Sequence, residues 1–278
     1  MARGDGMGEA HRESGAGRLA FDRVGSVGDP TVLLHGALDD RRTWAVVARQ
    51  LAPSLQLLVV DRREHGESRG PERRAPVADD ANDLARLLEA TGDFPAHLVA
   101  QGYGGAVALR LAGERPELVR SVAAHDVPFV ELAGAGGSGL RTFLRELRAP
   151  GAAPAPESLC REYLRLLGGP AEQWSSWGDS VRERFLASAP ALRRELADPR
   201  STAASTEALA EVSVPVLLTT GGQGPGFAAE VASRLGDALP NATVLALPGT
   251  GHLVQLTDPE LFAGVIGTFL LERNVPVS

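Results

Sequence analysis

HLVAQGYGGAVALRLA, residues 97–112, is the stretch of sequence that decides the fold. Its first residues are mostly apolar, as in a strand covered on both faces, and its last residues have the composition of a helix. Glycines at 102, 104 and 105 stand between them, so we expect the strand to pass into the helix through a sharp turn. The residue at the centre of that turn is Gly102, which carries no side chain.

Further apolar runs alternate with helical patterns on both sides of this unit. We expect strands within 18–34, on either side of the turn signal VGDP, and at 56–61, 96–101, 120–126, 214–221 and 243–249; helices are expected at 78–91, 104–114, 226–238 and from Pro259 onward. Short apolar strands that alternate with helices are typical of a parallel sheet with helices on both faces. The sequence therefore predicts an α/β fold with a doubly wound, mostly parallel sheet.

A long helical stretch separates the strand that ends at Asp126 from the strand that begins at Val214. It is too long for a loop, and the segments AGAGGSG and APGAAPAPES interrupt it too often for a second sheet. We expect residues 127–212 to form a helical cap, inserted after the sixth strand over the sheet edge where open α/β folds bind ligands. The α/β core then consists of residues 18–126 and 213–278, and residues 1–17 are expected to be a disordered tail.

Composition and charge exclude several classes of function. The net charge is −7, and the 28 basic residues, all arginine, are interspersed among 35 acidic ones, so no basic face for nucleic acid is predicted. No apolar run has the roughly 20 residues of a membrane helix, and the N-terminus has no signal-sequence pattern, so we expect a soluble cytoplasmic protein. The single cysteine, Cys160, predicts neither a disulfide nor a metal site, and no cofactor is expected. The absence of lysine indicates a bacterial genome rich in G and C.

Four segments together carry a resemblance to a known family. They are LLHGALDDRRTW (33–44), DRREHGES (61–68), AQGYGGAVAL (100–109) and LPGTGHLVQLTDPELF (247–262). In order and spacing they resemble the oxyanion loop, the Asp-Arg-x-Gly-His-Gly-x-Ser turn, the nucleophile elbow and the histidine loop of the α/β-hydrolase superfamily. The resemblance covers residues 18–273 and implies the α/β-hydrolase fold. It also implies that His252 is the catalytic histidine and that the N–H groups of Ala37 and Tyr103 form an oxyanion hole.

The chain departs from the family pattern at two members of the catalytic triad. Gly102 stands where the family has its nucleophilic serine, and Gly224 stands where its aspartate is expected; Glu64 also replaces a glycine of the second motif. Covalent serine catalysis at this turn is therefore excluded, because loss of such a nucleophile costs about 10⁶ in turnover. Glycine at 102 fits a turn that no longer needs a side chain, and it equally fits a site that needs space for a water molecule.

Asp126 is the candidate partner of His252. It ends the strand next to the elbow strand, and neighbouring strands lie about 4.8 Å apart, so its carboxylate can reach the histidine loop. A carboxylate there fixes the tautomer of the imidazole and stabilises its protonated form. An aspartate that only caps a loop is the alternative.

Four further side chains are candidates for substrate contact because of their positions. Gln101 precedes the turn, and His125 precedes Asp126 at the same sheet edge. Trp174 and Trp177, in the cap segment EQWSSW, fit the underside of the cap, and they fit packing between cap helices as well.

Three hypotheses for function remain open. In the first, His252 and Asp126 perform acid–base chemistry beside the oxyanion hole without a covalent intermediate; the reaction is an elimination, a cyclisation or a water-mediated hydrolysis of a carbonyl-bearing small molecule, such as a natural-product intermediate. In the second, the protein binds a small apolar ligand without changing it. In the third, it is an ordinary hydrolase whose nucleophile has been engineered away or replaced by a cap hydroxyl such as Ser175 or Ser176.

Overall fold

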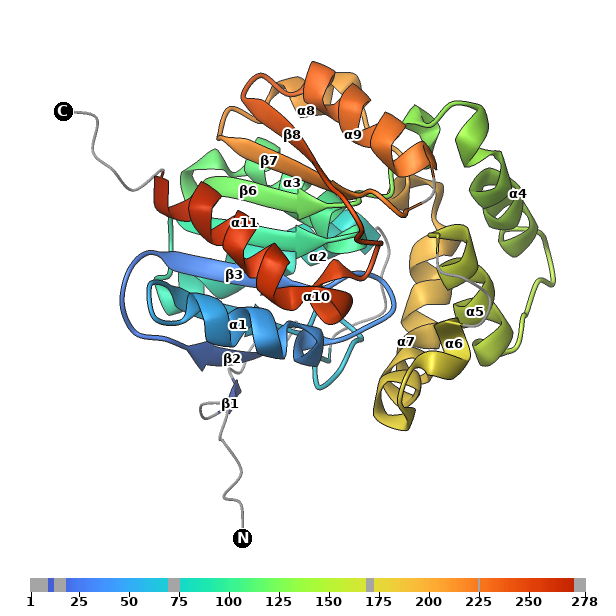
Figure 1. Ribbon diagram of the computed structural model, residues 1–278, viewed down its shortest axis with the longest axis horizontal. Helices are drawn as coiled ribbons and strands as arrows, with labels where there is room; N and C mark the ends of the chain where they lie inside the picture. Colours follow the sequence, from blue (N-terminus) through green and yellow to red (C-terminus); the bar gives the residue numbers. More distant parts are fainter. Residues whose placement is uncertain (1–9, 13–18, 70–75, 169–172, 225, 273–278) are drawn as a thin grey trace, which may run out of the picture.

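The computed structural model describes residues 10–12, 19–69, 76–168, 173–224 and 226–272. Over these residues the chain forms an eight-stranded sheet with the order β1-β2-β4-β3-β5-β6-β7-β8 (Figure 1). The strands are β1 (Ala10–Arg12), β2 (Ala20–Val24), β3 (Pro30–Leu34), β4 (Gln56–Val60), β5 (Ala96–Gln101), β6 (Val119–His125), β7 (Val216–Gly221) and β8 (Ala242–Leu247). β1 and β2 pair antiparallel, and all pairs from β4 to β8 are parallel. The predicted α/β class with a mostly parallel sheet is confirmed.

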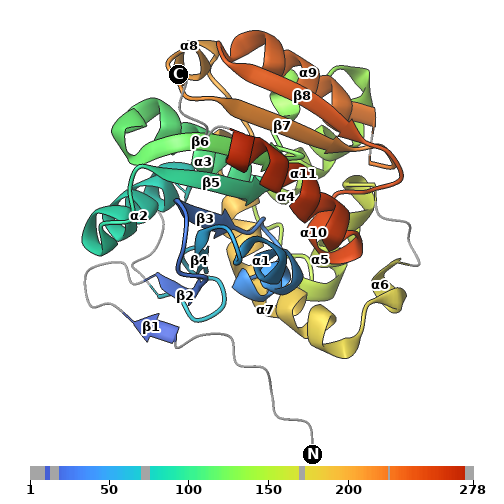
Figure 2. The ribbon, with the colours of Figure 1, turned by 60° about the vertical axis from the view of Figure 1, so that its left-hand side comes forward.

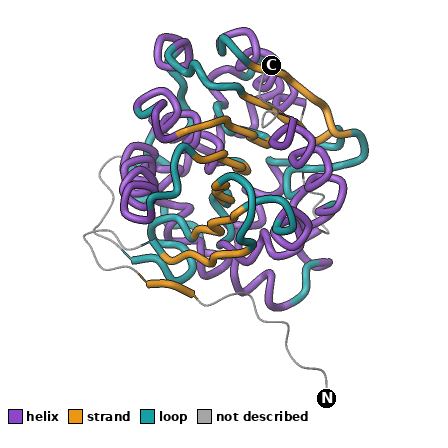
Figure 3. Tube along the Cα trace, turned by 90° about the vertical axis from the view of Figure 1, so that its left-hand side faces the viewer, coloured by secondary structure: helices purple, strands orange, loops and turns teal. Residues whose placement is uncertain are grey.

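Side chains that alternate along the central strands fill a core on each face of the sheet. On β5, Leu98 and Ala100 belong to the core of one face and Val99 to that of the other. The first face carries α2 (Pro76–Thr91), α3 (Tyr103–Glu114) and α9 (Gly226–Ala238); the second carries α1 (Ala45–Leu51), α10 (Val254–Thr257) and α11 (Pro259–Glu272) (Figure 2). In Figure 3 the strands form a twisted layer between these two groups of helices.

Most of the helices between β6 and β7 lie beyond the carboxyl ends of the parallel strands (Figure 1). They are α4 (Ser138–Leu147), α5 (Pro156–Leu166), α6 (Gln173–Ser176) and α7 (Asp179–Ala197). The last helix before β7, α8 (Thr206–Ala210), instead contacts α3 and α9 on the first face of the sheet. We call residues 127–212 the β6–β7 segment. Two ion pairs join α7 to the loops at that edge: Arg184 lies 2.8 Å from Asp39, which follows β3, and Glu195 lies 2.7 Å from Arg62, which follows β4.

Short 3₁₀ turns complete the connections. They are η1 (Arg41–Trp44), η2 (Pro116–Leu118), η3 (Val130–Leu132), η4 (Ala135–Gly137) and η5 (Pro199–Ser201). No helix among the described residues is long and apolar enough to span a membrane.

One local expectation needs correction. Ala10–Arg12, within the segment expected to be a disordered tail, forms β1 and pairs with β2, with Arg12 opposite Ala20; the other residues of that tail lie outside the described residues. The two strands expected on either side of VGDP are present as β2 and β3, and β4 lies between them in the sheet.

Candidate active site

Gly102 forms the sharp turn between β5 and α3. Its backbone angles are φ 53° and ψ −124°, and its amide donates to the carbonyl of His125 on the neighbouring strand at 2.8 Å. An L-residue in such a conformation is strained by about 1–3 kcal/mol, whereas glycine adopts it without steric cost. The turn therefore keeps the geometry that would aim a side chain out of the sheet, and it carries none.

His252 faces this turn from the loop after β8. A Cβ atom placed on Gly102 would lie 3.3 Å from Nε2 and 3.4 Å from Cε1 of the imidazole. The other ring nitrogen, Nδ1, lies 3.2 Å from Oδ2 of Asp126. The imidazole side chain is 11% exposed. The structure thus brings the two predicted residues together and directs the second nitrogen of the ring at the space above Gly102.

Asp126 follows β6 and is held by the backbone of β7. Its amide donates to the carbonyl of Thr219 at 3.0 Å, and Oδ1 accepts from the amide of Gly221 at 3.3 Å. Its φ of 46° is in the left-handed region, which aspartate tolerates better than most residues. Burial alone would raise the pKa of this carboxyl group, but the rings of His125 and His252 outweigh burial and lower the pKa to about 2. Asp126 is therefore a carboxylate at neutral pH.

Gly224, where the family resemblance places an aspartate, lies beside this same carboxylate. A Cβ atom on Gly224 would be 3.8 Å from Oδ2 of Asp126. The position at which the family resemblance expects an acid and the carboxylate of Asp126 are therefore close in space, although they are far apart in the sequence.

Gln101 lies within hydrogen-bond distance of the remaining nitrogen of the His252 ring. Its amide Nε2 lies 2.7 Å from Nε2 of His252 and 3.1 Å from the backbone carbonyl oxygen of the same residue. Gln101 is buried, at 2% exposed. Gln101 was expected to contact the substrate; in this structure its side chain contacts His252.

Arg62 holds the loop that carries the first expected oxyanion donor. Its Nε donates to the carbonyl of His35 at 2.9 Å and its Nη2 to the carbonyl of Gly36 at 2.8 Å. Because a trans peptide directs its C=O and N–H to opposite sides, the N–H of Ala37 points away from Arg62. Gly36 also borders the space above the turn, since its Cα lies 3.8 Å from a Cβ placed on Gly102. The arginine therefore fixes the orientation of this donor.

The second expected donor, the N–H of Tyr103, lies at the first turn of α3, the end of a helix that favours negative charge. The guanidinium carbon of Arg62 lies 4.5 Å from the centre of the Tyr103 ring. One arginine therefore contacts the residues on both sides of the expected oxyanion site.

A buried ionic cluster ties Arg62 to α7 and α2. Arg62 pairs with Glu195 at 2.7 Å and with Asp80 at 2.9 Å, and His65 also lies 3.0 Å from Glu195. All four side chains are at most 2% exposed. Buried charges of this kind persist only when they are paired and hydrogen-bonded. Sequence reasoning did not identify this cluster: the DRREHGES motif indicated Arg62, but nothing marked Glu195, 133 residues further along the chain.

The comparison with protein families decides the classification. The alpha/beta hydrolase fold model matches residues 29–259, which is most of the chain. The chain belongs to the alpha/beta hydrolase fold family.

Individual proteins are similar to the chain over nearly its whole length. The chain is 26% identical over 264 residues to the 2-(acetamidomethylene)succinate hydrolase of Mesorhizobium japonicum, covering 91% of this chain and 92% of that protein. It is 28% identical over 263 residues to the dihydrolipoyllysine-residue acetyltransferase component of the acetoin cleaving system of Pseudomonas putida; that match covers 88% of this chain and only 64% of the longer relative. The crystal structure of an alpha/beta hydrolase from Sphaerobacter thermophilus matches 94% of this chain and 100% of its own, with a TM-score of 0.74 and 25% identity.

The expectation that His125 contacts the substrate needs correction. Its ring is fully buried: Nδ1 lies 3.0 Å from the hydroxyl of Thr219, and Nε2 lies 3.1 Å from the carbonyl of Gly251. Burial lowers the pKa of His125, so the ring is neutral at pH 7. It supports the loop that carries His252 and is not placed to contact a substrate.

The candidate residues of the β6–β7 segment fall into two groups, packed tryptophans and exposed serines. Trp174 and Trp177 both pack against Phe185 of α7, with ring centres 6.3 Å and 6.1 Å from that of Phe185, so packing within the β6–β7 segment accounts for both. Ser175 and Ser176 are exposed on α6. Substrate contact by the tryptophans remains a prediction.

Cys160 is buried on α5, and burial raises the pKa of its thiol to about 12. Among the residues that the structure describes, no group of three or more His, Cys, Asp or Glu side chains is arranged to hold a metal ion.

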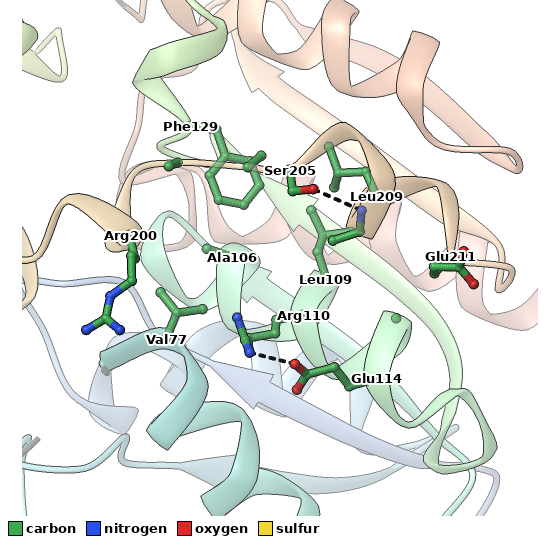
Figure 4. A pocket seen from close by; sticks show the side chains of 14 residues that line it. Val77, Ala106, Leu109, Arg110, Glu114, Phe129, Arg200, Ser205, Leu209 and Glu211 are labelled. Atoms are coloured by element: carbon green, nitrogen blue, oxygen red, sulfur yellow. Dashed lines mark hydrogen bonds and ion pairs between the residues drawn. The ribbon is translucent and has the colours of Figure 1, made fainter. Parts of the chain in front are cut away.

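A separate cavity of about 500 Å³ lies between α2, α3 and residues 200–211 (Figure 4). Its apolar lining includes Val77, Leu109, Phe129 and Leu209. Arg110 in its lining is paired with Glu114 at 2.6 Å. Neither His252 nor Asp126 lines this cavity, so it is distinct from the candidate active site.

Proposed function

We propose that this chain is an enzyme that performs acid–base chemistry on a carbonyl-bearing small molecule without forming a covalent enzyme intermediate. The observation that carries the proposal is the alignment of Asp126, His252 and the side-chain-free turn at Gly102. Nδ1 of the imidazole lies 3.2 Å from the carboxylate, and Nε2 lies 3.3 Å from the place where a Cβ of residue 102 would be. The imidazole thus faces the turn at which the family resemblance places the nucleophile.

In the proposed mechanism, Nε2 of His252 removes a proton from the substrate or from a water molecule. Asp126 accepts the Nδ1–H bond and stabilises the imidazolium that forms. The N–H groups of Ala37 and Tyr103 bind the substrate oxygen on which negative charge develops. The proton then returns from Nε2 to the leaving group or to the product carbon. Elimination, cyclisation and water-mediated hydrolysis all follow this scheme.

Proton transfer of this kind contributes roughly 10²–10⁴ to a rate, and each well-placed oxyanion donor adds roughly 10² or more. A useful rate therefore does not require a serine. The hydrolase from Mesorhizobium japonicum, a relative over 92% of its own length, supports the water-mediated form of the reaction. We further propose that residues 127–212, the β6–β7 segment, form a cap over the site, with residues 18–126 and 213–278 as the core.

A second candidate function, ligand binding without chemistry, is favoured by one observation. The only lone pair of the imidazole that faces the turn is engaged by the amide of Gln101 at 2.7 Å. If no ligand displaces that amide, the site binds without reacting.

Hydrogen–deuterium exchange separates the two candidates. The wild-type protein and His252→Ala are incubated in D₂O with a panel of small ketones and thioesters, and exchange at the carbon next to the carbonyl is followed by ¹H NMR. We expect the wild-type protein to accelerate exchange of at least one compound by 10²–10⁴ over His252→Ala. Equal exchange with the two proteins across the panel would contradict the acid–base proposal.

Two additional measurements complete the test. A fluorophosphonate probe should label no serine of the wild-type protein, whereas labelling of Ser175 or Ser176 would favour a hydrolase with a displaced nucleophile. The natural substrate is sought by incubating the protein with the metabolite extract of a source strain that lacks the gene. A compound consumed by the wild-type protein and not by His252→Ala would be the substrate.

A further inference from the structure

The side-chain amide of Gln101 has a defined orientation. Its nitrogen lies 3.1 Å from the backbone carbonyl oxygen of His252, and a carbonyl oxygen can only accept. The nitrogen end of the amide is therefore on this side, and its second N–H points at Nε2 of the ring, 2.7 Å away. Both protons of the amide are used on the same histidine.

This orientation fixes the protonation pattern of the whole row. Because Gln101 donates to Nε2, that nitrogen accepts and carries no proton. The ring proton is then on Nδ1, which donates to Asp126. Carboxylate, imidazole and amide form one chain of hydrogen bonds, in which the amide holds the place that a nucleophile hydroxyl has in a serine triad.

The amide of Gln101 lies against the backbone of the oxyanion loop. A Cβ on Gly36 would lie 2.1 Å from Oε1 of Gln101, so the two are in close contact. On the other side, a Cβ on Gly102 would lie 3.3 Å from Nε2 of the ring, and glycine leaves that position without a side chain. The amide lies between the oxyanion loop and the imidazole.

We infer that Gln101 is a positioning residue: its side-chain amide donates a hydrogen bond to the base, Nε2 of His252, in the resting protein, and the substrate must displace it. This rests on the proposed function and deepens it. A ligand that reaches Nε2 has to replace the lost hydrogen bond with its own O–H or N–H, or the ring is left unpaired in a buried site. The arrangement selects substrates that carry such a donor beside the carbonyl group, and it keeps the base inactive toward molecules that lack one.

The reactivity of Nε2 toward diethyl pyrocarbonate tests this inference without any turnover. The lone pair of Nε2 attacks the reagent, and modification of His252 is followed by peptide mass spectrometry. We expect slow modification in the wild-type protein and modification at least ten times faster in Gln101→Met, which keeps the length of the side chain and removes both donors. Gln101→Ala should react at least as fast as Gln101→Met.

Gln255→Met is the matched control. Gln255 is also a buried glutamine near the histidine loop, and it donates to the hydroxyl of Thr43 at 3.2 Å, not to His252. This variant should react at the wild-type rate, and circular dichroism should show the same fold for all four proteins.

The possible results are distinct. Equal rates in the wild-type protein and both Gln101 variants would overturn the inference. Fast reaction of Gln101→Ala with slow reaction of Gln101→Met would also overturn it, because the glutamine would then be a steric cover and not a hydrogen-bond donor. If His252 does not accelerate deuterium exchange but the pyrocarbonate rates are as expected, only the proposed function is overturned. The pyrocarbonate rates depend only on the resting arrangement of Gln101 and His252.

Discussion

At the scale of single residues, Gly102 is the position where one substitution has the most specific expected effect. In Gly102→Ser the new Cβ would lie 3.3 Å from Nε2 of His252, so the ring has to move away by a few tenths of an ångström, and the attached hydroxyl then lies next to Nε2. We expect slow hydrolysis of p-nitrophenyl acetate by this variant and none by the wild-type protein.

This activity should depend on the histidine and have a cost in stability. Adding His252→Ala to Gly102→Ser should abolish it, because the hydroxyl then has no base. The positive φ of residue 102 should lower the free energy of unfolding by about 1–3 kcal/mol, measured by urea denaturation. A folded variant with no ester hydrolysis, both alone and combined with Gln101→Ala, would show that the dyad is not aligned with the turn.

The second residue-scale prediction concerns the acid. In the Gly102→Ser background, Asp126→Asn should reduce ester hydrolysis by about 10³–10⁴, because an amide in place of the carboxylate no longer selects the Nδ1–H tautomer. Adding Gly224→Asp should restore a measurable part, since a Cβ there lies 3.8 Å from the present carboxylate oxygen. Rates are compared at equal protein concentration, with Gly224→Ala as the control that adds a Cβ without an acid. Recovery with Gly224→Ala would contradict the exchange of acids.

At the scale of elements, α7 is held to the core by its buried Glu195. In Glu195→Gln the charge of Arg62 loses a partner that is 0% exposed, and the removal of one member of a buried pair costs about 3–5 kcal/mol. Asp80 remains as a second partner of the arginine, so we expect about 3 kcal/mol in urea denaturation. Glu183→Gln, an exposed position on the same helix, is the control and should change stability by less than about 0.5 kcal/mol. Similar losses in both variants would contradict a specific anchor.

The elements also show what can be inferred from sequence and why. The β5–turn–α3 unit was predictable because the apolar run, the glycines and the helix are contiguous, and the pairing of His252 with Asp126 followed from strand ends that meet at one sheet edge. The contact of Glu195 with Arg62 was not predictable, since it joins residues 133 apart through the packing of α7. The position of Gln101 was also missed, because the direction of its side chain depends on the conformation of the turn that follows it.

At the scale of the whole molecule, buried histidines link stability to pH. Burial, together with the charge of Arg62, lowers the pKa of His35 well below its usual value, and burial lowers that of His125. In the unfolded chain both rings return to a pKa near 6.5. The unfolded state therefore binds more protons than the folded state below about pH 6.5, so stability is fully present above that pH and is lost as the pH falls.

We expect the free energy of unfolding to decrease between pH 6.5 and 5.5, with each of these two rings contributing up to about 1.4 kcal/mol per pH unit. Most carboxyl groups titrate at lower pH and contribute little in this window, so the histidines dominate it. Urea denaturation at pH 7.5, 6.5 and 5.5 measures the slope. His125→Asn should be less stable at pH 7.5 but should have a slope smaller by up to one proton, because the buried ring that resists protonation is gone. An unchanged slope would mean that His125 is already able to take up a proton in the folded protein, and the rigid, neutral support of the His252 loop would then be wrong.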